Sequence, residues 1–315
     1  MTARIADFLG VFAVTAAQLT RTLALIGLLA AAAVPRLPAQ DAPRPALPAP
    51  GDSGTRHIVK LRDGSTLVGR IVESWGDSAR FESLSGPLTL RRADVTAVRT
   101  VRSSAIHNGK YWPEDPSATR LFFAPTGRTL AKGDGYYSNH WVFLSDVHWG
   151  VSDQFTLGGA MTMFPTENFL KDNLYFISPK LSVTRSDRLN VAVGAFVGVA
   201  PFFENATENT FGIAYGVATW GGPDASLTLG GGYGFVGGKM ADSPIAMLGI
   251  TKRVSSGWTF VSENWIVPET NRPLVSYGFR SIGERVAWDL GFVTVLGEEG
   301  IFPGVPWLGL TWKFR

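Results

Sequence analysis

The chain has 315 residues, of which 17% are charged and 12% aromatic, with a net charge of +3 and no cysteine. The lack of cysteine excludes disulfides, thiolate zinc sites and cysteine nucleophiles, and the nearly balanced charge argues against nucleic acid as the main partner. Few charges together with many aromatic residues favour a protein with a lipid-facing band over a soluble domain.

Residues 1–39 have the pattern of a signal peptide for export. Arg4 and Arg21 give a positive start, residues 23–34 form a continuous apolar run, and Ala39 is a small residue at a plausible cleavage point. The alternative is a membrane anchor, but the apolar run is short for a helical span of about 20 residues. Residues 40–56 are rich in proline and alanine and predict a disordered leader.

Residues 57–103 predict a small β-module of five short strands. An Asp-Gly turn follows its first strand, and such a pair tolerates the positive φ of a tight hairpin. The sequence LRDG at residues 61–64, with GRI at residues 69–71, resembles the motif of Sm-like and SH3-like small β-barrels. The resemblance implies a closed five-stranded barrel. Some relatives bind RNA, which an exported module would not meet, so we expect a periplasmic module that has a structural role or docks a protein.

Residues 104–118 contain two prolines and predict a linker. Residues 119–315 then divide into extended segments, most of them near the roughly 9–11 residues that cross a bilayer as a tilted strand. These segments are residues 120–130, 135–149, 154–164, 173–185, 189–203, 210–221, 225–238, 244–254, 258–268, 272–282, 286–296 and 305–314.

The segments predict an all-β fold, a transmembrane antiparallel β-barrel. Short turns tend to alternate with longer links, as periplasmic turns and outer loops do in outer-membrane barrels. Both termini should be periplasmic, so the number of strands should be even. We expect about twelve strands, or ten if another segment fails together with residues 120–130, which Pro125 and Gly127 weaken. The closing strand, residues 305–314, has the alternating pattern and aromatic end that are usual for such barrels.

Alternation along the strands assigns their two faces. Leu227 and Leu229 share one face of their segment, and Tyr215 and Val217 share one face of theirs. Because a charge at the lipid midplane costs roughly 2–4 kcal/mol, we expect the large apolar residues to face lipid and their small or polar neighbours to face the lumen. A soluble β-sandwich would carry more charge on its outer face.

Charged residues on the inward face define a candidate lumen. The polar residues expected to line it are Asp146, His148, Lys180, Lys252, Glu263, Arg280 and Asp289. They either select a small solute in an open lumen or form a salt-bridge network that fills a narrow barrel. The aromatic residues expected at the membrane interfaces, where such rings lie between lipid and water, are Trp141, Trp149, Trp258, Trp288, Trp312 and Phe314.

The sequence predicts no cofactor, metal or catalytic site. His140 and His148 lie on one predicted strand, about 27 Å apart at ~3.3 Å per residue, so they are not expected to share an ion. Ser145 lies on the opposite face of that strand from His148, which does not suit a nucleophile and its base. No Walker loop, dinucleotide fingerprint or His-Glu-x-x-His motif occurs.

Three sequence stretches carry a family resemblance. They are RLFFAPTG at residues 120–127, KGDGYY at residues 132–137 and WGVSDQFTLGG at residues 149–159. They resemble a family of uncharacterised bacterial outer-membrane β-barrel proteins. The resemblance covers residues 119–315 and implies the fold and the location, with no catalytic residues.

The sequence therefore predicts a protein of the bacterial outer membrane, in contact with its lipid, with the N-terminal module in the periplasm. We expect a passive pore or small-solute channel rather than an enzyme. The alternative is a non-conducting structural or interaction barrel that docks a periplasmic protein through residues 57–103. A third hypothesis, a lipid-modifying barrel enzyme, requires a nucleophile–base pair that the sequence does not show.

Overall fold

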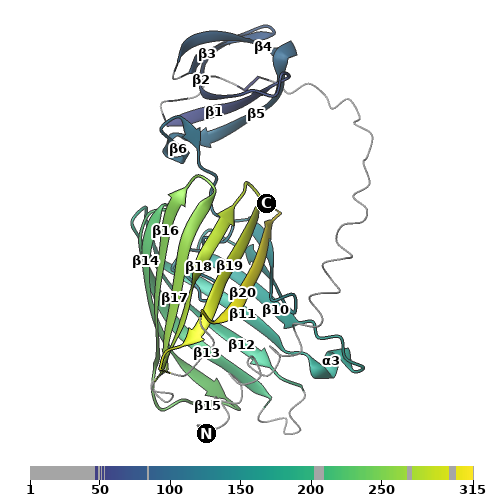
Figure 1. Cartoon of the computed structure of the whole chain (residues 1–315), viewed down its shortest axis with the longest axis vertical. Coiled ribbons are helices and arrows are strands. Elements are labelled where there is room, and N and C mark those ends of the chain that lie inside the picture. The colour runs from purple at the N-terminus through teal and green to yellow at the C-terminus, as the bar shows by residue number, and fades with distance from the viewer. Residues whose placement is uncertain are drawn as a thin grey trace. The chain divides into compact units, whose positions relative to one another are not determined.

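The computed structural model describes residues 47–48, 50, 52, 54–83, 85–201, 209–267, 272–297 and 303–314. The predicted signal peptide and most of the predicted leader lie outside these residues. Within the described part of the chain, no helix is long and apolar enough to cross a membrane. The described residues form two compact units, which meet in the sequence between Pro113 and Glu114 (Figure 1).

The N-terminal unit is a five-stranded antiparallel sheet, followed by short elements. The sheet contains β1 (Thr55–Leu61), β2 (Thr66–Trp75), β3 (Ser78–Ser83), β4 (Gly86–Arg91) and β5 (Val95–Arg102), and the 3-10 turn η1 (Arg92–Asp94), the 3-10 turn η2 (Ser103–Ala105), β6 (Ile106–His107) and β7 (Lys110–Tyr111) complete the unit. The order β4-β3-β2-β1-β5 leaves β4 paired only with β3, and β5 only with β1, among the described residues. The sheet is therefore open, which corrects the prediction of a closed small barrel.

The core of this unit lies on one face of the sheet. Its buried side chains include Val59, Ile71 and Phe81. The predicted Asp-Gly turn is confirmed: Gly64 has a φ of 88°, and Asp63 Oδ1 accepts hydrogen bonds from the Ser65 amide at 2.8 Å and hydroxyl at 2.7 Å. These two bonds lower the pKa of the Asp63 carboxyl, because they stabilise its charged form.

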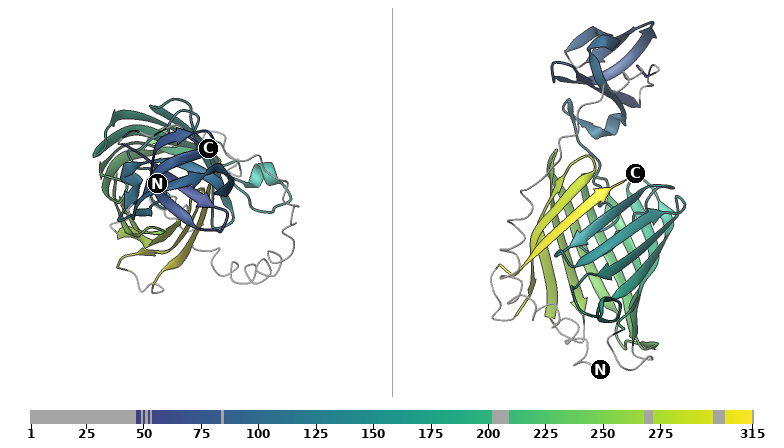
Figure 2. Two further views of the ribbon diagram at one scale, coloured as in Figure 1. Left: turned by 90° about the horizontal axis from the view of Figure 1, so that it is seen from above. Right: turned by 90° about the vertical axis from the view of Figure 1, so that its right-hand side faces the viewer.

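The C-terminal unit is a closed antiparallel barrel of twelve strands, counted over the described residues, whose tilted wall is visible in Figure 2. The strands are β8 (Gly135–His140), β9 (Leu144–Gly150), β10 (Phe155–Thr162), β11 (Tyr175–Arg185), β12 (Leu189–Val199), β13 (Thr210–Gly221), β14 (Ala225–Val236), β16 (Ile245–Ser255), β17 (Trp258–Val267), β18 (Arg272–Ile282), β19 (Val286–Val295) and β20 (Val305–Lys313), with the two-residue β15 (Lys239–Met240) and the short helix α3 (Phe169–Asp172) in outer connections. The last strand pairs with the first, from Gly309 opposite His140 to Lys313 opposite Tyr136. Closure leaves no exposed sheet edge, as a lipid environment requires.

The total of twelve strands is confirmed, but two of its members were predicted wrongly. Residues 135–149 are a hairpin, β8 and β9, because the chain turns at residues 141–143, where Trp141 and Val142 have positive φ values of 50° and 70°. Residues 120–130 are not a strand: their one β-bridge joins Arg120 to Pro125 within the segment itself. The two errors cancel in the count.

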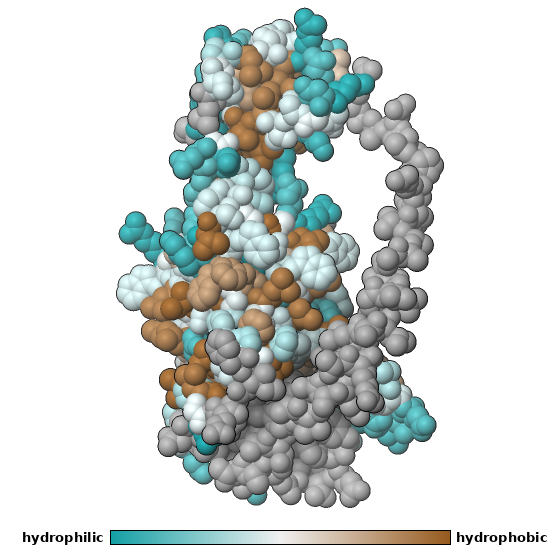
Figure 3. Space-filling model, in the orientation of Figure 1, coloured by the Kyte–Doolittle hydropathy of each residue, from teal (hydrophilic) through white to brown (hydrophobic). Residues whose placement is uncertain are grey.

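The faces of most barrel strands follow the prediction. On β14, Leu227 and Leu229 are exposed on the outer wall, and Ser226 and Thr228 are buried inside. Figure 3 shows apolar side chains over much of the described wall that it presents. The outer wall is therefore apolar, as lipid contact requires.

The inner and outer faces of strand β13 are exchanged relative to the prediction. Val217 is buried and Tyr215 half-buried on the inside, while Ala214 and Gly216 are exposed on the outside. The reason is that the inside of this barrel is filled, so large apolar residues are stabilised there as well as in lipid.

Exposed tryptophans gather at one end of the barrel, which we call the short-turn end because β9–β10, β11–β12, β13–β14, β16–β17 and β18–β19 are joined there. Trp149, Trp258, Trp288 and Trp312 are 52%, 43%, 53% and 48% exposed within a few residues of this end. Trp220, which the prediction did not include, is also there and is 67% exposed. Two other predicted interface residues differ: Trp141 lies at the opposite end with its ring tilted against that of the buried Trp307, and Phe314 is half-buried.

Candidate functional site: a plug inside the barrel

Residues 115–130, called the plug from here on, run inside the barrel rather than along its wall. All residues of 116–130 are buried except Ala118, Phe123 and Arg128, which are intermediate. The plug is a tight hairpin, because the Thr126 amide donates to Thr119 O at 3.0 Å and the Leu121 amide donates to Ala124 O at 2.8 Å. These bonds satisfy backbone groups that no wall strand reaches.

The plug enters and leaves the barrel at the short-turn end. Its first arm runs inward to the tip, and its second arm runs back. On the first arm, Ser117 Oγ donates to Thr311 Oγ1 near the end of β20 at 2.9 Å. On the second arm, Arg128 Nη2 donates to Gly222 O in the turn after β13 at 2.9 Å. The tip of the plug lies deeper, beside Glu263 in the middle of β17.

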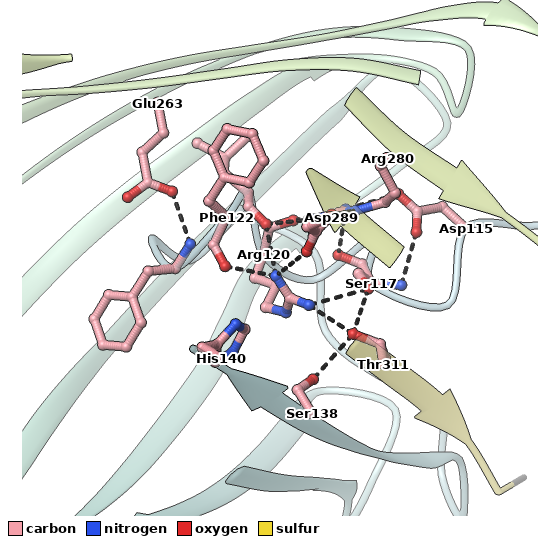
Figure 4. Close-up of polar contacts among 12 residues, drawn as sticks. Asp115, Ser117, Arg120, Phe122, Ser138, His140, Glu263, Arg280, Asp289 and Thr311 are labelled. Carbon is pink, nitrogen blue, oxygen red and sulfur yellow. Dashed lines mark hydrogen bonds and ion pairs between the residues drawn. The ribbon is translucent and has the colours of Figure 1, made fainter. Parts of the chain in front are cut away.

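Arg280 of β18 is the centre of the contact between plug and wall (Figure 4). Its side chain is fully buried. Its Nε donates to Asp289 Oδ1 on the neighbouring strand at 2.6 Å, and its Nη1 donates to Asp115 Oδ2 of the plug at 2.9 Å. It also donates to the backbone carbonyls of Ser117, Arg120 and Leu121. One wall side chain thus binds the plug through a carboxylate and three carbonyls.

Arg120 of the plug completes the ionic network from the other side. Its Nη1 donates to Asp289 Oδ2 at 3.0 Å, and its Nη2 donates to Thr311 Oγ1 at 2.6 Å (Figure 4). Asp115, Arg280, Asp289 and Arg120 therefore alternate in charge, with two groups from the plug and two from the wall. Buried ion pairs persist when their hydrogen bonds are also satisfied, and here the plug supplies most of them.

Glu263 of β17 binds the tip of the plug. Its Oε2 accepts hydrogen bonds from the amides of Phe123 at 2.9 Å and Ala124 at 3.0 Å, and its Oε1 accepts one from Trp265 Nε1 at 2.7 Å. Figure 4 shows the Glu263 carboxylate with a dashed hydrogen bond to a nitrogen atom. One wall carboxylate thus holds the tip of the plug through two backbone amides.

Two wall glycines make room for the plug. A Cβ placed on Gly249 of β16 would lie 2.1 Å from Leu121 Cδ1, and one on Gly291 of β19 would lie 3.1 Å from Phe122 Cζ. On the plug itself, a Cβ at Gly127 would lie 2.0 Å from Asn190 O of the wall. Side chains at these positions would collide with plug or wall atoms, so the inner surface and the plug have complementary shapes.

His140, Asp146 and His148 form a second polar group inside the barrel. Asp146 Oδ2 lies 3.0 Å from His140 Nε2, and its Oδ1 lies 3.3 Å from His148 Nε2. The predicted separation of about 27 Å along one strand is wrong, because the two histidines lie on adjacent strands of the β8–β9 hairpin. Within the described residues, no group of three histidine, cysteine or acidic side chains has the geometry to hold a metal ion.

The structure brings most of the predicted lumen residues together on the inner surface. Asp146, Lys180, Glu263, Arg280 and Asp289 are buried there, and His148 is half-buried beside Asp146. Lys252 is different: it is exposed and shares its side of β16 with the exposed Leu248 and Ile250. Lys252 faces outward because it is two residues from Ile250, and residues two apart on a strand lie on the same face.

Sequence reasoning missed the partners of these residues, which are Asp115, Arg120 and the backbone of the plug. A signal was present, because Pro125 and Gly127 made residues 120–130 a poor strand. A segment of the barrel unit that cannot form a wall strand can lie in the lumen, where its backbone groups find partners in the protein.

Comparison with known proteins finds no matching protein-family model and no matching curated protein. Similar solved structures include the KdgM porin, with a TM-score of 0.42 and 9% identity over 58% of this chain and 98% of that chain. The NanC porin has a TM-score of 0.35 and 10% identity over 57% of this chain and 97% of that chain. OmpF of Salmonella typhi has a TM-score of 0.31 and 8% identity over 83% of this chain and 95% of that chain. Strand pairing by itself defines the C-terminal unit, over the described residues, as a closed antiparallel β-barrel of twelve strands.

Proposed function

We propose that this chain is an outer-membrane β-barrel that is sealed by its own plug and does not conduct solutes in this conformation. The observation that carries the proposal is that the plug accepts hydrogen bonds from the Arg280 guanidinium, through the Asp115 carboxylate and three backbone carbonyls. A passive pore would instead present these charged groups to water. Two cavities beside the plug have volumes of about 30 and 20 Å³, enough for only one or two waters each.

The outer wall supports a location in the bacterial outer membrane. Leu229, Ile177 and Leu290, from separate strands, are 54%, 55% and 46% exposed on the outside. Large apolar side chains exposed on strands all around a barrel are normal in contact with lipid. The exposed tryptophans at the short-turn end fit one membrane interface, where indole rings lie between lipid and water.

The course of the chain supports a periplasmic position for the N-terminal module. In outer-membrane barrels the short turns face the periplasm. Glu114 begins the barrel unit and Asp115 already contacts Arg280, close to the short-turn end of β18. The module of residues 57–103 therefore precedes the plug on the periplasmic side, where it is available to dock a protein.

Conductance of the purified protein in planar lipid bilayers tests the seal. We expect the full chain to be silent, and a variant with residues 117–127 replaced by a Gly-Ser stretch of equal length to conduct, because the wall remains closed without the plug. Glu167→Ser, in the outer connection before α3, is the matched control and should stay silent. Steady conductance of the unmodified chain at the level of the variant would establish the passive pore instead.

A crosslink tests whether the plug occupies the lumen in the membrane. The chain has no cysteine, so Leu121→Cys with Gly249→Cys introduces a single pair where a wall Cβ would lie against the plug side chain. We expect this pair to oxidise in intact cells. Leu121→Cys with Ala246→Cys, which lies on the outer face of the same strand, should not. Equal crosslinking of both pairs would contradict the position of the plug.

A further inference from the structure

Lys180 of β11 is a buried cation that differs from Arg120 and Arg280 in its partners. It is 6% exposed, and its ammonium donates to Thr119 O at 2.9 Å and Thr126 O at 3.3 Å, one carbonyl from each arm of the plug. Arg120 and Arg280 are each paired with carboxylates. Among the described residues Lys180 has no such pair, and its partners are carbonyl oxygens.

A buried charge without a counter-charge is costly, because the protein interior replaces only part of the hydration that the ion has lost. Two carbonyl oxygens satisfy two of the three ammonium hydrogens and neutralise none of the charge. Asp146, the carboxylate that lines the same cavity, already interacts with two histidines. An anion next to Lys180 would supply the counter-charge that no described side chain provides.

Lys180 lines a cavity of about 30 Å³ between the plug and the inner wall. Ser178 and Tyr215 line the same cavity and bring a hydroxyl group each. His140 also lines it, and its buried Nδ1 has no hydrogen-bond partner. Polar groups from β8, β11 and β13 thus converge next to the cation.

Two wall glycines make room for the polar side chains that line this cavity. A Cβ on Gly158 would lie 2.2 Å from Ser178 Oγ and 2.5 Å from His148 Nδ1, and one on Gly194 would lie 2.5 Å from the Tyr215 hydroxyl. The hydroxyls and the imidazole occupy the positions that side chains at the two glycines would take. The polar lining of the cavity therefore depends on these glycines.

We propose that this cavity binds one small monovalent anion, chloride or a carboxylate the size of formate, with Lys180 as its counter-charge and the hydroxyls of Ser178 and Tyr215 as hydrogen-bond donors. The size of the cavity sets the class of ligand, since a water-sized group needs about 10–15 Å³. The space takes two such groups, which fits chloride with one water or a formate. A tetrahedral oxyanion such as sulfate is too large. Because Lys180 also binds both arms of the plug, the anion links the wall to the plug. Its binding can be tested whether or not the barrel conducts.

Thermal unfolding of the full chain in detergent, read as heat-modifiable migration, tests the site. At constant ionic strength we expect chloride, bromide and formate to raise the unfolding midpoint to a plateau, and gluconate and sulfate to leave it unchanged. Lys180→Met should abolish the chloride dependence. Lys252→Met, which removes an exposed lysine from the outer wall, should retain it.

A second variant and a direct probe keep the test decisive if Lys180→Met does not fold. Tyr215→Phe retains the cation and should shift the plateau to higher chloride concentration. Crystals grown in bromide should show an anomalous peak in contact with Lys180 Nζ. A midpoint that rises equally in chloride and gluconate, or a cavity that holds only water in bromide crystals, would overturn the proposal.

Discussion

Side chains alternate between two faces in both the N-terminal module and the barrel. In the module the large apolar side chains are turned inward, and in the barrel many of them are turned outward. In β3 of the module, Phe81 is fully buried between the exposed Arg80 and Glu82. In β19 of the barrel, Asp289 is 1% exposed and its neighbour Trp288 is 53% exposed. Alternation determines that the two faces differ, and the surrounding medium determines which face is turned inward.

The comparison also shows what each interior needs. The core of the module is apolar and needs only close packing. The interior of the barrel holds charges, which need partners, and the plug supplies the missing carboxylate, guanidinium and carbonyl groups. Removing a charged side chain should therefore have very different effects in the two regions.

The largest effect is expected from the central arginine of the barrel. Arg280→Met leaves Asp115 and Asp289 without their shared cation, and breaking a buried ion pair costs about 3–5 kcal/mol. Arg80→Met, on the exposed face of β3, should change stability by no more than about 0.5 kcal/mol. Urea unfolding in lipid vesicles measures both. Equal losses would mean that the two environments do not differ as described.

A similar loss, confined to the module, is expected for Phe81→Ala. Truncating a buried phenylalanine costs about 3–5 kcal/mol through lost burial and the cavity that remains. The barrel should keep its heat-modifiable migration, because its strands close without the module. Limited proteolysis should then cut within residues 57–103. Simultaneous unfolding of the barrel would show that the two units are not separate folding units.

A smaller effect is expected on the outer wall. Leu229→Arg places a charge on the lipid-facing side of β14, which costs roughly 2–4 kcal/mol near the midplane. Thr89→Arg, on the exposed face of β4, is the matched change in the module and should be nearly neutral. The comparison is made by urea unfolding in vesicles. A neutral Leu229→Arg would argue that this wall faces water.

The smallest effect is a pH dependence of the module. Burial lowers the pKa of His57, and its Nδ1 accepts a hydrogen bond from the Ile71 amide at 3.1 Å, which a protonated ring cannot do. The unfolded chain takes up this proton near pH 6.5 and the folded chain does not. Stability should therefore be constant above that pH and fall below it, by at most about 1.4 kcal/mol per pH unit.

Hydrogen exchange of the amides in β1 and β2, corrected for the intrinsic pH dependence of exchange, measures this loss in the full chain. His57→Gln is the control, because the glutamine amide oxygen can accept the Ile71 bond but does not titrate in this range. Protection that stays constant through pH 5 in the unmodified chain would contradict the role of His57.

Much of the barrel could be predicted from the sequence, for a local reason. Strand length, the alternation in β14 and β19, and the turns at the short-turn end are properties of neighbouring residues. The face of β13 could not be predicted in this way. Tyr215 and Val217 are as suitable for lipid as for a filled lumen, and only the plug distinguishes the two.

The candidate site shows the same division. The sequence by itself determined that Arg280 and Asp289 share the inner face, because Phe279 beside Arg280, and both neighbours of Asp289, are large apolar residues that belong in lipid. It did not determine their plug partners, since Asp115 and Arg120 lie more than 150 residues away along the chain. Nor did it place His140 beside Asp146, because a turn with positive φ at Trp141 reverses the strand. Contacts of this kind depend on barrel closure around the plug, which is a property of the whole fold.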